Sequence, residues 1–260
     1  MWAIEHEDRA NRGLGDEGLT GVTFDSDGHR LVGVLYLARG EEPKPTVLLL
    51  HGCPGLEKNL DLAVRLREAG WNALAFHYRG CWGSAGRYDL LSIPRDVTAA
   101  VDYLAGCPRV DPGRIAVLGH SLGGWAAVVT AAVEPRLSAV AVYGAAARLG
   151  EALALSPAVI DAEFTRFLAT TPEEFASQVA VVAERMDGLE AVGAIGPRPL
   201  LVVHGTADRW VPVTQARELS QRAGSSCRYV EVEGADHAFS WHRAELADLV
   251  VGWLSEGAMG

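Results

Sequence analysis

The chain has 260 residues, of which 49% are apolar and 22% are charged, and its formal charge is −10. This length and balance suit one globular domain with a large core, which we predict over residues 1–260. The acidic balance argues against the basic face that binds nucleic-acid phosphates, and no apolar run approaches the roughly 18 residues of a membrane span. We therefore expect neither nucleic acid nor a membrane as a partner.

The first residues, from Met1 to Arg9, show no basic start followed by an apolar run, so they do not resemble a secretory signal peptide. We expect a cytoplasmic protein, in which thiols stay reduced. Cys53, Cys81, Cys107 and Cys227 have no metal-type spacing, so free cysteines and no metal site are predicted.

From about residue 20, short apolar runs alternate with helical patterns. The first two strands flank Asp27-Gly28, a hairpin signal. Further strands are expected near residues 45–51, 71–78, 114–119, 137–143, 199–204 and 228–232. Helices are expected near 56–70, 94–104, 125–133, 212–223 and 241–254. This alternation predicts an α/β fold, with a mostly parallel twisted sheet of about eight strands and helices on both faces.

Two local patterns add detail to this prediction. In the first helix, we expect Leu56, Leu60, Ala63 and Val64 to share one face. Residues 148–196 break the alternation, because they contain helical patterns with no strand between them. In that segment Thr171 and Glu174 fit a capping box, and an apolar stripe follows at Phe175, Val179, Val182 and Met186. We interpret 148–196 as a small helical cap insertion; a flanking helix with a long connection is the alternative.

The sequence Gly119-His120-Ser121-Leu122-Gly123 matches the G-x-S-x-G pattern. An apolar strand precedes it and an alanine-rich helical pattern follows it, which is the context of a nucleophile elbow. On such a turn the Ser121 hydroxyl stands exposed above the sheet, and the following helix N-terminus favours negative charge. The pattern therefore predicts Ser121 as a nucleophile.

A serine hydroxyl needs a base within hydrogen-bond reach, and the base needs an orienting acid. Asp208 and His237 each follow a predicted strand, in the order Ser, acid, His that this elbow architecture uses. The carboxyl ends of parallel strands share one edge of a sheet, where ligands bind. We predict His237 as the general base and Asp208 as its partner, with Asp236 as the rival acid. His51 and His204 are expected to hold loops together, and His120 is expected to point into the elbow.

A tetrahedral intermediate requires two N–H donors aimed at its oxyanion. Leu122, directly after the nucleophile, is one candidate. The backbone N–H of Cys53, in the loop after the strand at 45–51, is the other, because Pro54 has no N–H. Trp82 and Trp210 are candidate substrate-binding side chains that could line an aromatic wall. Arg79, Arg87 and Arg209 could bind a substrate carboxylate or pair with a local one such as Asp89 or Asp96.

The sequence resembles the α/β-hydrolase-fold serine hydrolases, in the group that includes dienelactone-hydrolase-like and prolyl-oligopeptidase-type enzymes. The resemblance covers roughly residues 45–255 and rests on residues 51–55, 78–86, 111–124, 204–212 and 234–237. It implies the α/β-hydrolase fold, a triad of Ser121, Asp208 and His237, and an oxyanion hole of Cys53 and Leu122. Ser121 departs from true dienelactone hydrolases, whose nucleophile is cysteine.

The leading hypothesis is a carboxylesterase-like enzyme that acts on a small-molecule substrate with a small or medium acyl or aryl group. A thioesterase, amidase or peptidase with the same triad is one alternative, and a biosynthetic acyltransferase, lyase or cyclase is another. A ligand-binding protein without activity is the alternative from another class. No cofactor motif is present in the sequence, so no cofactor is expected, and a homodimer is a base-rate expectation only.

Overall fold

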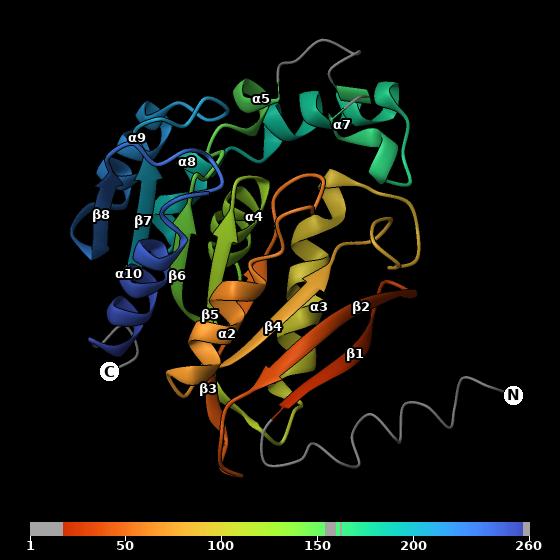
Figure 1. The fold of residues 1–260 in the computed structure, drawn as a ribbon. Coiled ribbons are helices and arrows are strands. Elements are labelled where there is room, and N and C mark those ends of the chain that lie inside the picture. The colour runs from red at the N-terminus through yellow and green to blue at the C-terminus, as the bar shows by residue number, and fades with distance from the viewer. Residues whose placement is uncertain (1–17, 154–159, 162, 257–260) are drawn as a thin grey trace, which may run out of the picture.

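The computed structural model describes residues 18–153, 160–161 and 163–256 (Figure 1). Its eight-stranded sheet has the spatial order β1-β2-β4-β3-β5-β6-β7-β8. The strands are β1 (Gly18–Ser26), β2 (His29–Leu37), β3 (Lys44–Leu50), β4 (Asn72–His77), β5 (Val110–His120), β6 (Leu137–Tyr143), β7 (Leu200–Gly205) and β8 (Cys227–Val232). β2 pairs antiparallel with β1 and β4, and all the other neighbours pair parallel. The predicted fold, with a mostly parallel sheet of about eight strands, is confirmed.

Helices cover both faces of this sheet. The described α-helices are α2 (Leu60–Glu68), α3 (Ile93–Ala105), α4 (Leu122–Ala131), α5 (Leu149–Ala152), α7 (Pro172–Arg185), α8 (Gly188–Ala191), α9 (Val213–Ala223) and α10 (Arg243–Ser255). Short 3₁₀ turns are η1 (Leu90–Ser92), η2 (Thr165–Phe167), η3 (Val192–Ala194) and η4 (Gly224–Ser226). Apolar residues of α3, α4 and α9 belong to one core layer and those of α2 and α10 to the other.

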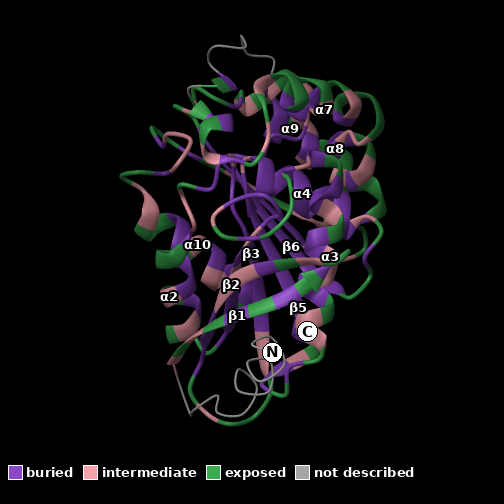
Figure 2. Ribbon diagram, turned by 90° about the vertical axis from the view of Figure 1, so that its right-hand side faces the viewer, coloured by how far each residue is buried: buried purple, intermediate pink, exposed green. Residues whose placement is uncertain are grey.

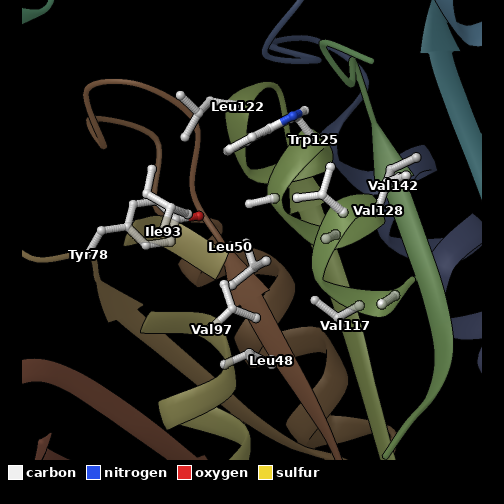
Figure 3. Close-up of a cluster of buried hydrophobic side chains, with 14 of the residues drawn as sticks. Leu48, Leu50, Tyr78, Ile93, Val97, Val117, Leu122, Trp125, Val128 and Val142 are labelled. Atoms are coloured by element: carbon white, nitrogen blue, oxygen red, sulfur yellow. The ribbon is translucent and has the colours of Figure 1, made fainter. Parts of the chain in front are cut away.

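The central strand β3 carries a continuous apolar run at residues 47–50. Leu48 and Leu50 point into the layer that contains α3 and α4, as Figure 3 shows. Val47 and Leu49 belong to the layer on the opposite face. Since both faces are covered, a parallel strand must be apolar at every position rather than at alternate ones. Figure 2 shows the resulting buried sheet between helices that expose their outer surfaces.

The N-terminal hairpin forms as the turn residues predict. Ser26 pairs with His29 across the turn, and Asp27 and Gly28 both have positive φ, at 52° and 80°. A two-residue turn with positive φ at both positions matches the right-handed twist of the strands it joins.

The prediction that Leu56 shares a face of the first helix is wrong, because Leu56 lies outside that helix. Helix α2 begins only at Leu60, and its buried residues are Leu62, Ala63 and Leu66. Leu56 is 60% exposed and Leu60 is 41% exposed. Leu56 belongs to the loop before the helix, so it does not follow the helical period on which the prediction depended.

Between β6 and β7 lies the inserted segment, which we define as residues 148–196. Its described helices α5 and α7 lie beyond the carboxyl ends of the parallel strands (Figure 1). The capping box is present: the Glu174 amide donates to the Thr171 hydroxyl, and the Thr171 amide donates to the Glu174 carboxylate. Phe175, Val179 and Val182 of α7 are buried, as their stripe predicts, whereas Met186 lies just past the end of the helix and is partly buried.

Residues 154–159 and 162 of the inserted segment lie outside the described residues. Residues 1–17 and 257–260 also lie outside the described residues. The expected absence of a secretory signal depends on the first of these ranges. Among the helices that are described, none combines the length and apolar character needed to cross a bilayer.

Candidate active site

Ser121 occupies a sharp turn between β5 and α4, as the motif predicts. Its φ of 55° and ψ of −120° lie in a region that L-residues rarely adopt. The turn is tight enough to require glycine on both sides: a Cβ at Gly119 would lie 2.1 Å from the Gly123 carbonyl oxygen, and one at Gly123 would lie 2.2 Å from the Leu50 carbonyl oxygen. The glycines of the motif therefore let the helix start directly against β3 and β5.

Asp208 and His237 come together across the loops after β7 and β8. His237 Nδ1 donates to Asp208 Oδ2 at 2.7 Å, and the aspartate side chain is only 1% exposed. The other carboxylate oxygen, Oδ1, accepts the amides of Trp210 at 2.8 Å and Val211 at 2.9 Å. These bonds fix the carboxylate and place the imidazole proton on Nδ1, which leaves Nε2 as an acceptor.

Asp236, the rival acid, has a different role. Its Oδ1 accepts the backbone amide of Ser240 at 2.8 Å, and this bond lowers the pKa of the Asp236 carboxyl. It therefore closes the turn after His237, and Asp208 is the carboxylate that bonds the imidazole.

The neighbouring histidines support these loops. His204 Nε2 donates to the Val211 carbonyl at 2.9 Å and also lies 3.4 Å from Asp208 Oδ2. His120 Nε2 donates to the His237 carbonyl at 3.0 Å, and its ring stacks on Tyr143. Burial lowers the pKa of both imidazoles, so both are neutral at pH 7. The proximity of His204 to Asp208 is a contact that the sequence analysis did not predict.

Ser121 and His237 open onto one cavity of about 230 Å³. Its lining is mostly apolar and consists of Gly52, Cys53, Pro54, Gly55, Leu56, Glu57, His120, Ser121, Leu122, Ala146, Leu149, Ala152, Leu153, Glu163, Phe164, Trp210, Val211, His237 and Ala238. The inserted segment supplies its share from α5 and from residues 163–164. Sequence reasoning missed this contribution, since apolar residues of a ligand cavity and of a core look alike in sequence.

Both expected oxyanion donors border this cavity. Gly52 brings its loop against the nucleophile, because a Cβ there would lie 3.0 Å from Ser121 Cβ. Among the described residues, no backbone carbonyl accepts the amide of Cys53 or Leu122. Burial raises the pKa of the Cys53 thiol to about 12, so this side chain stays protonated and is a poor nucleophile. All four cysteines are free.

The two candidate tryptophans differ in position. Trp210 lines the cavity and meets Phe164 edge to face, with ring centroids 6.1 Å apart. Trp82 is not among the described lining residues, so the expectation that it forms part of the cavity wall is not met. Its indole N–H donates to the Pro54 carbonyl at 2.5 Å instead.

Arg79 and Arg87 pair with carboxylates outside the cavity, and Arg209 is not among the described residues that line it. Arg79 binds Asp96 with an Nη2–Oδ1 distance of 2.7 Å, and Arg87 pairs with Glu174. The charged side chains that line the described cavity are Glu57 and Glu163, and no arginine or lysine belongs to that lining. Among the described residues, no group of three His, Cys, Asp or Glu side chains is arranged to hold a metal ion.

Comparison with known proteins assigns the family. The model of the Alpha/beta hydrolase family matches residues 47–249. Uncharacterized protein Rv2307c of Mycobacterium tuberculosis is 32% identical over 218 residues, which cover 83% of this chain and 71% of that protein. Est1E from Butyrivibrio proteoclasticus, solved with ferulic acid bound, has a TM-score of 0.74 and 22% identity over 90% of this chain and 98% of its own. The esterase domain from a Rhodothermus marinus protein has a TM-score of 0.69 and 25% identity over 92% of this chain and 99% of its own. The chain belongs to the alpha/beta hydrolase family.

Proposed function

We propose that this member of the family is a serine hydrolase that cleaves a carboxylic ester through an acyl-Ser121 intermediate. One observation carries the proposal: Ser121 and His237 line the same apolar cavity, and His237 Nδ1 donates to the buried Asp208 carboxylate at 2.7 Å. A base oriented in this way can accept a proton through Nε2, which activation of a serine requires.

The proposed reaction has two steps, acylation of Ser121 and hydrolysis of the acyl-enzyme. Ser121 Oγ attacks the ester carbonyl while His237 Nε2 takes the hydroxyl proton, and the Cys53 and Leu122 amides bind the oxyanion that forms. The tetrahedral intermediate collapses as the imidazolium gives that proton to the leaving alkoxide, which departs as an alcohol. Water then attacks the acyl-serine with the same base, so that a carboxylic acid is released and Ser121 is restored.

The cavity favours an uncharged acyl or aryl group. Leu56, Leu149 and Phe164 offer apolar contact, and the carboxylates of Glu57 and Glu163 would repel an anionic acyl group. The ferulic acid bound to Est1E is an aromatic acid, which makes a ferulate ester a useful test substrate. Within the family, we place the chain by proposal with the dienelactone-hydrolase-like and prolyl-oligopeptidase-type enzymes. The stretches of sequence that resemble that group include Ser121, Asp208 and His237.

The test combines a fluorophosphonate probe with p-nitrophenyl acetate, butyrate and octanoate and with methyl ferulate. We expect the wild type to be labelled and to hydrolyse at least one ester, whereas Ser121→Ala does neither. Ser255→Ala removes a hydroxyl at the far end of α10, where it donates to the Val251 carbonyl, and should leave labelling and turnover unchanged. A wild type that neither labels nor hydrolyses any of these esters contradicts the proposal, as does a Ser121→Ala variant that keeps its activity.

A further inference from the structure

Trp82 is held in an unusual conformation beside the cavity. Its φ of 51° lies in the left-handed region, which a bulky residue rarely adopts. Such strain persists only where surrounding contacts over-determine the conformation, and it is concentrated at functional sites. Two sets of contacts bear on the site, one toward the loop that carries Cys53 and one toward the inserted segment. The Lys58 ammonium also lies over the indole ring, 4.5 Å from its centroid.

The first direction is the oxyanion loop, which we define as residues 51–55. The Trp82 indole N–H donates to the Pro54 carbonyl at 2.5 Å, one residue after Cys53. Gly55 lies so close that a Cβ there would be 2.6 Å from Trp82 Nε1. At the other end of the loop, the Tyr78 hydroxyl donates to the His51 carbonyl at 3.2 Å. Two aromatic side chains thus hold the carbonyl groups on either side of the Cys53 amide.

The second direction is the inserted segment. The Trp82 ring stacks on Phe167 of η2, with centroids 6.1 Å apart and an interplanar angle of 17°. On either side of Trp82 the backbone is bonded to the same segment: the Ala169 amide donates to the Gly80 carbonyl at 2.7 Å, and the Tyr88 amide donates to the Ala169 carbonyl at 3.1 Å. The loop that carries Trp82 is therefore fastened to the inserted segment.

We propose that Trp82 is a positioning residue: it holds the oxyanion loop so that the Cys53 amide faces the substrate carbonyl, and Phe167 holds Trp82 in turn. The inserted segment then does more than line the cavity, because its contact with Trp82 sets the alignment of an oxyanion donor. Packing alone would not need the indole N–H, since any large apolar ring could stack on Phe167. This inference rests on the proposed esterase function.

The central experiment compares Trp82→Phe with Trp125→Phe, using the ester that the wild type cleaves best. Trp82→Phe removes the bond to Pro54 and keeps an aromatic ring beside Phe167 and under the Lys58 ammonium. Trp125→Phe removes an indole bond of the same kind, from Nε1 to the Met186 carbonyl at 2.7 Å, away from the oxyanion loop. Thermal unfolding of each variant reports the cost in stability separately from the effect on catalysis.

Loss of a whole oxyanion donor lowers kcat by about 10²–10³-fold, so misalignment of one should lower it by about tenfold or more. We expect this loss in kcat for Trp82→Phe with KM within about threefold of the wild type, because the oxyanion forms only after the substrate binds. Trp125→Phe should change kcat by less than about threefold. Phe167→Leu should lower kcat in the same direction, and the double variant should lose less than the product of the two single effects, since both act through one contact.

The inference is overturned if Trp82→Phe keeps kcat within about twofold of the wild type, if its loss lies wholly in KM, or if Trp125→Phe loses as much. If Trp82→Phe does not fold, Phe167→Leu tests the same contact from the inserted segment, and an unchanged kcat in that variant also overturns it. A wild type without esterase activity would refute the proposed function instead, and Ser121→Ala distinguishes the two cases.

Discussion

The Asp208→Asn substitution tests the orienting role of this carboxylate with little change in shape. The asparagine oxygen can still accept the amides of Trp210 and Val211, which bond Oδ1 in the wild type. An NH₂ group then replaces Oδ2 and faces His237 Nδ1 at the present 2.7 Å. Because an amide nitrogen only donates, Nδ1 must become the acceptor and the imidazole proton must move to Nε2.

A histidine with its proton on Nε2 cannot take the proton of Ser121. We expect kcat to fall by about 10³–10⁴-fold, which corresponds to about 4–5.5 kcal/mol of transition-state stabilisation. The free energy of unfolding should fall by only about 1–2 kcal/mol, since the backbone bonds survive. Stopped-flow or steady-state hydrolysis of a p-nitrophenyl ester, together with urea unfolding, measures both quantities.

Asp236→Asn is the matched control, because this carboxylate precedes His237 directly and accepts the Ser240 amide at 2.8 Å, whereas Asp208 bonds the imidazole. Its kcat should stay within about threefold of the wild type. The assignment of Asp208 would be refuted if Asp208→Asn kept more than a tenth of wild-type kcat, or if Asp236→Asn lost activity to the same extent.

Three further predictions concern the elbow, the cavity and pH. Gly123→Ala should lower the free energy of unfolding, measured by urea titration, by about 3 kcal/mol, because the new Cβ would lie 2.2 Å from the Leu50 carbonyl oxygen. Gly252→Ala is the control: this position in α10 has nothing within 4 Å of a Cβ, so the same quantity should rise by about 0.5–1 kcal/mol. Trp210→Ala opens the cavity beside Phe164 and should raise the octanoate-to-acetate ratio of kcat/KM by about tenfold; an unchanged ratio would exclude Trp210 from the acyl site. Burial lowers the pKa of His51 to about 4, while an unfolded histidine titrates near about 6.5, so below that pH the unfolded chain takes up a proton that the folded chain does not. The free energy of unfolding should therefore fall by about 2 kcal/mol from this group between pH 7 and pH 5, and His51→Gln should show a correspondingly weaker dependence on pH.

The sheet and the Asp208–His237 contact were predictable for the same reason. Continuous apolar runs separated by helical periods fix a parallel sheet, and parallel strands place their carboxyl ends at one edge. Two polar residues that follow β7 and β8 must then lie near the residue that follows β5. The glycines beside Ser121 add a local constraint that only one backbone geometry satisfies, as the 2.1 Å and 2.2 Å approaches demonstrate.

The cavity wall was not predictable, because hydrophobic pattern indicates burial and not what covers the side chain. Leu56 has the spacing of a helical core residue, yet it lies before α2, is 60% exposed and faces the cavity. Leu149 has core-like burial and also lines the cavity. Which apolar surface meets a ligand depends on where the inserted segment lies over the sheet, and that placement depends on contacts between residues far apart in sequence.

Trp82 and Trp210 illustrate the same limit at a single residue type. Both follow strands at the carboxyl edge of the sheet, so their sequence contexts predict the same role. At Trp82 the backbone has a positive φ and the indole N–H bonds the Pro54 carbonyl, whereas Trp210 lines the cavity beside Phe164. The positive φ of Trp82 is not encoded by any local sequence pattern. It thus distinguishes Trp82, which bonds the loop, from Trp210, which lines the cavity. For this reason Trp82→Phe and Trp210→Ala should differ in kind: the first should act on kcat with every ester, and the second on the preference among esters.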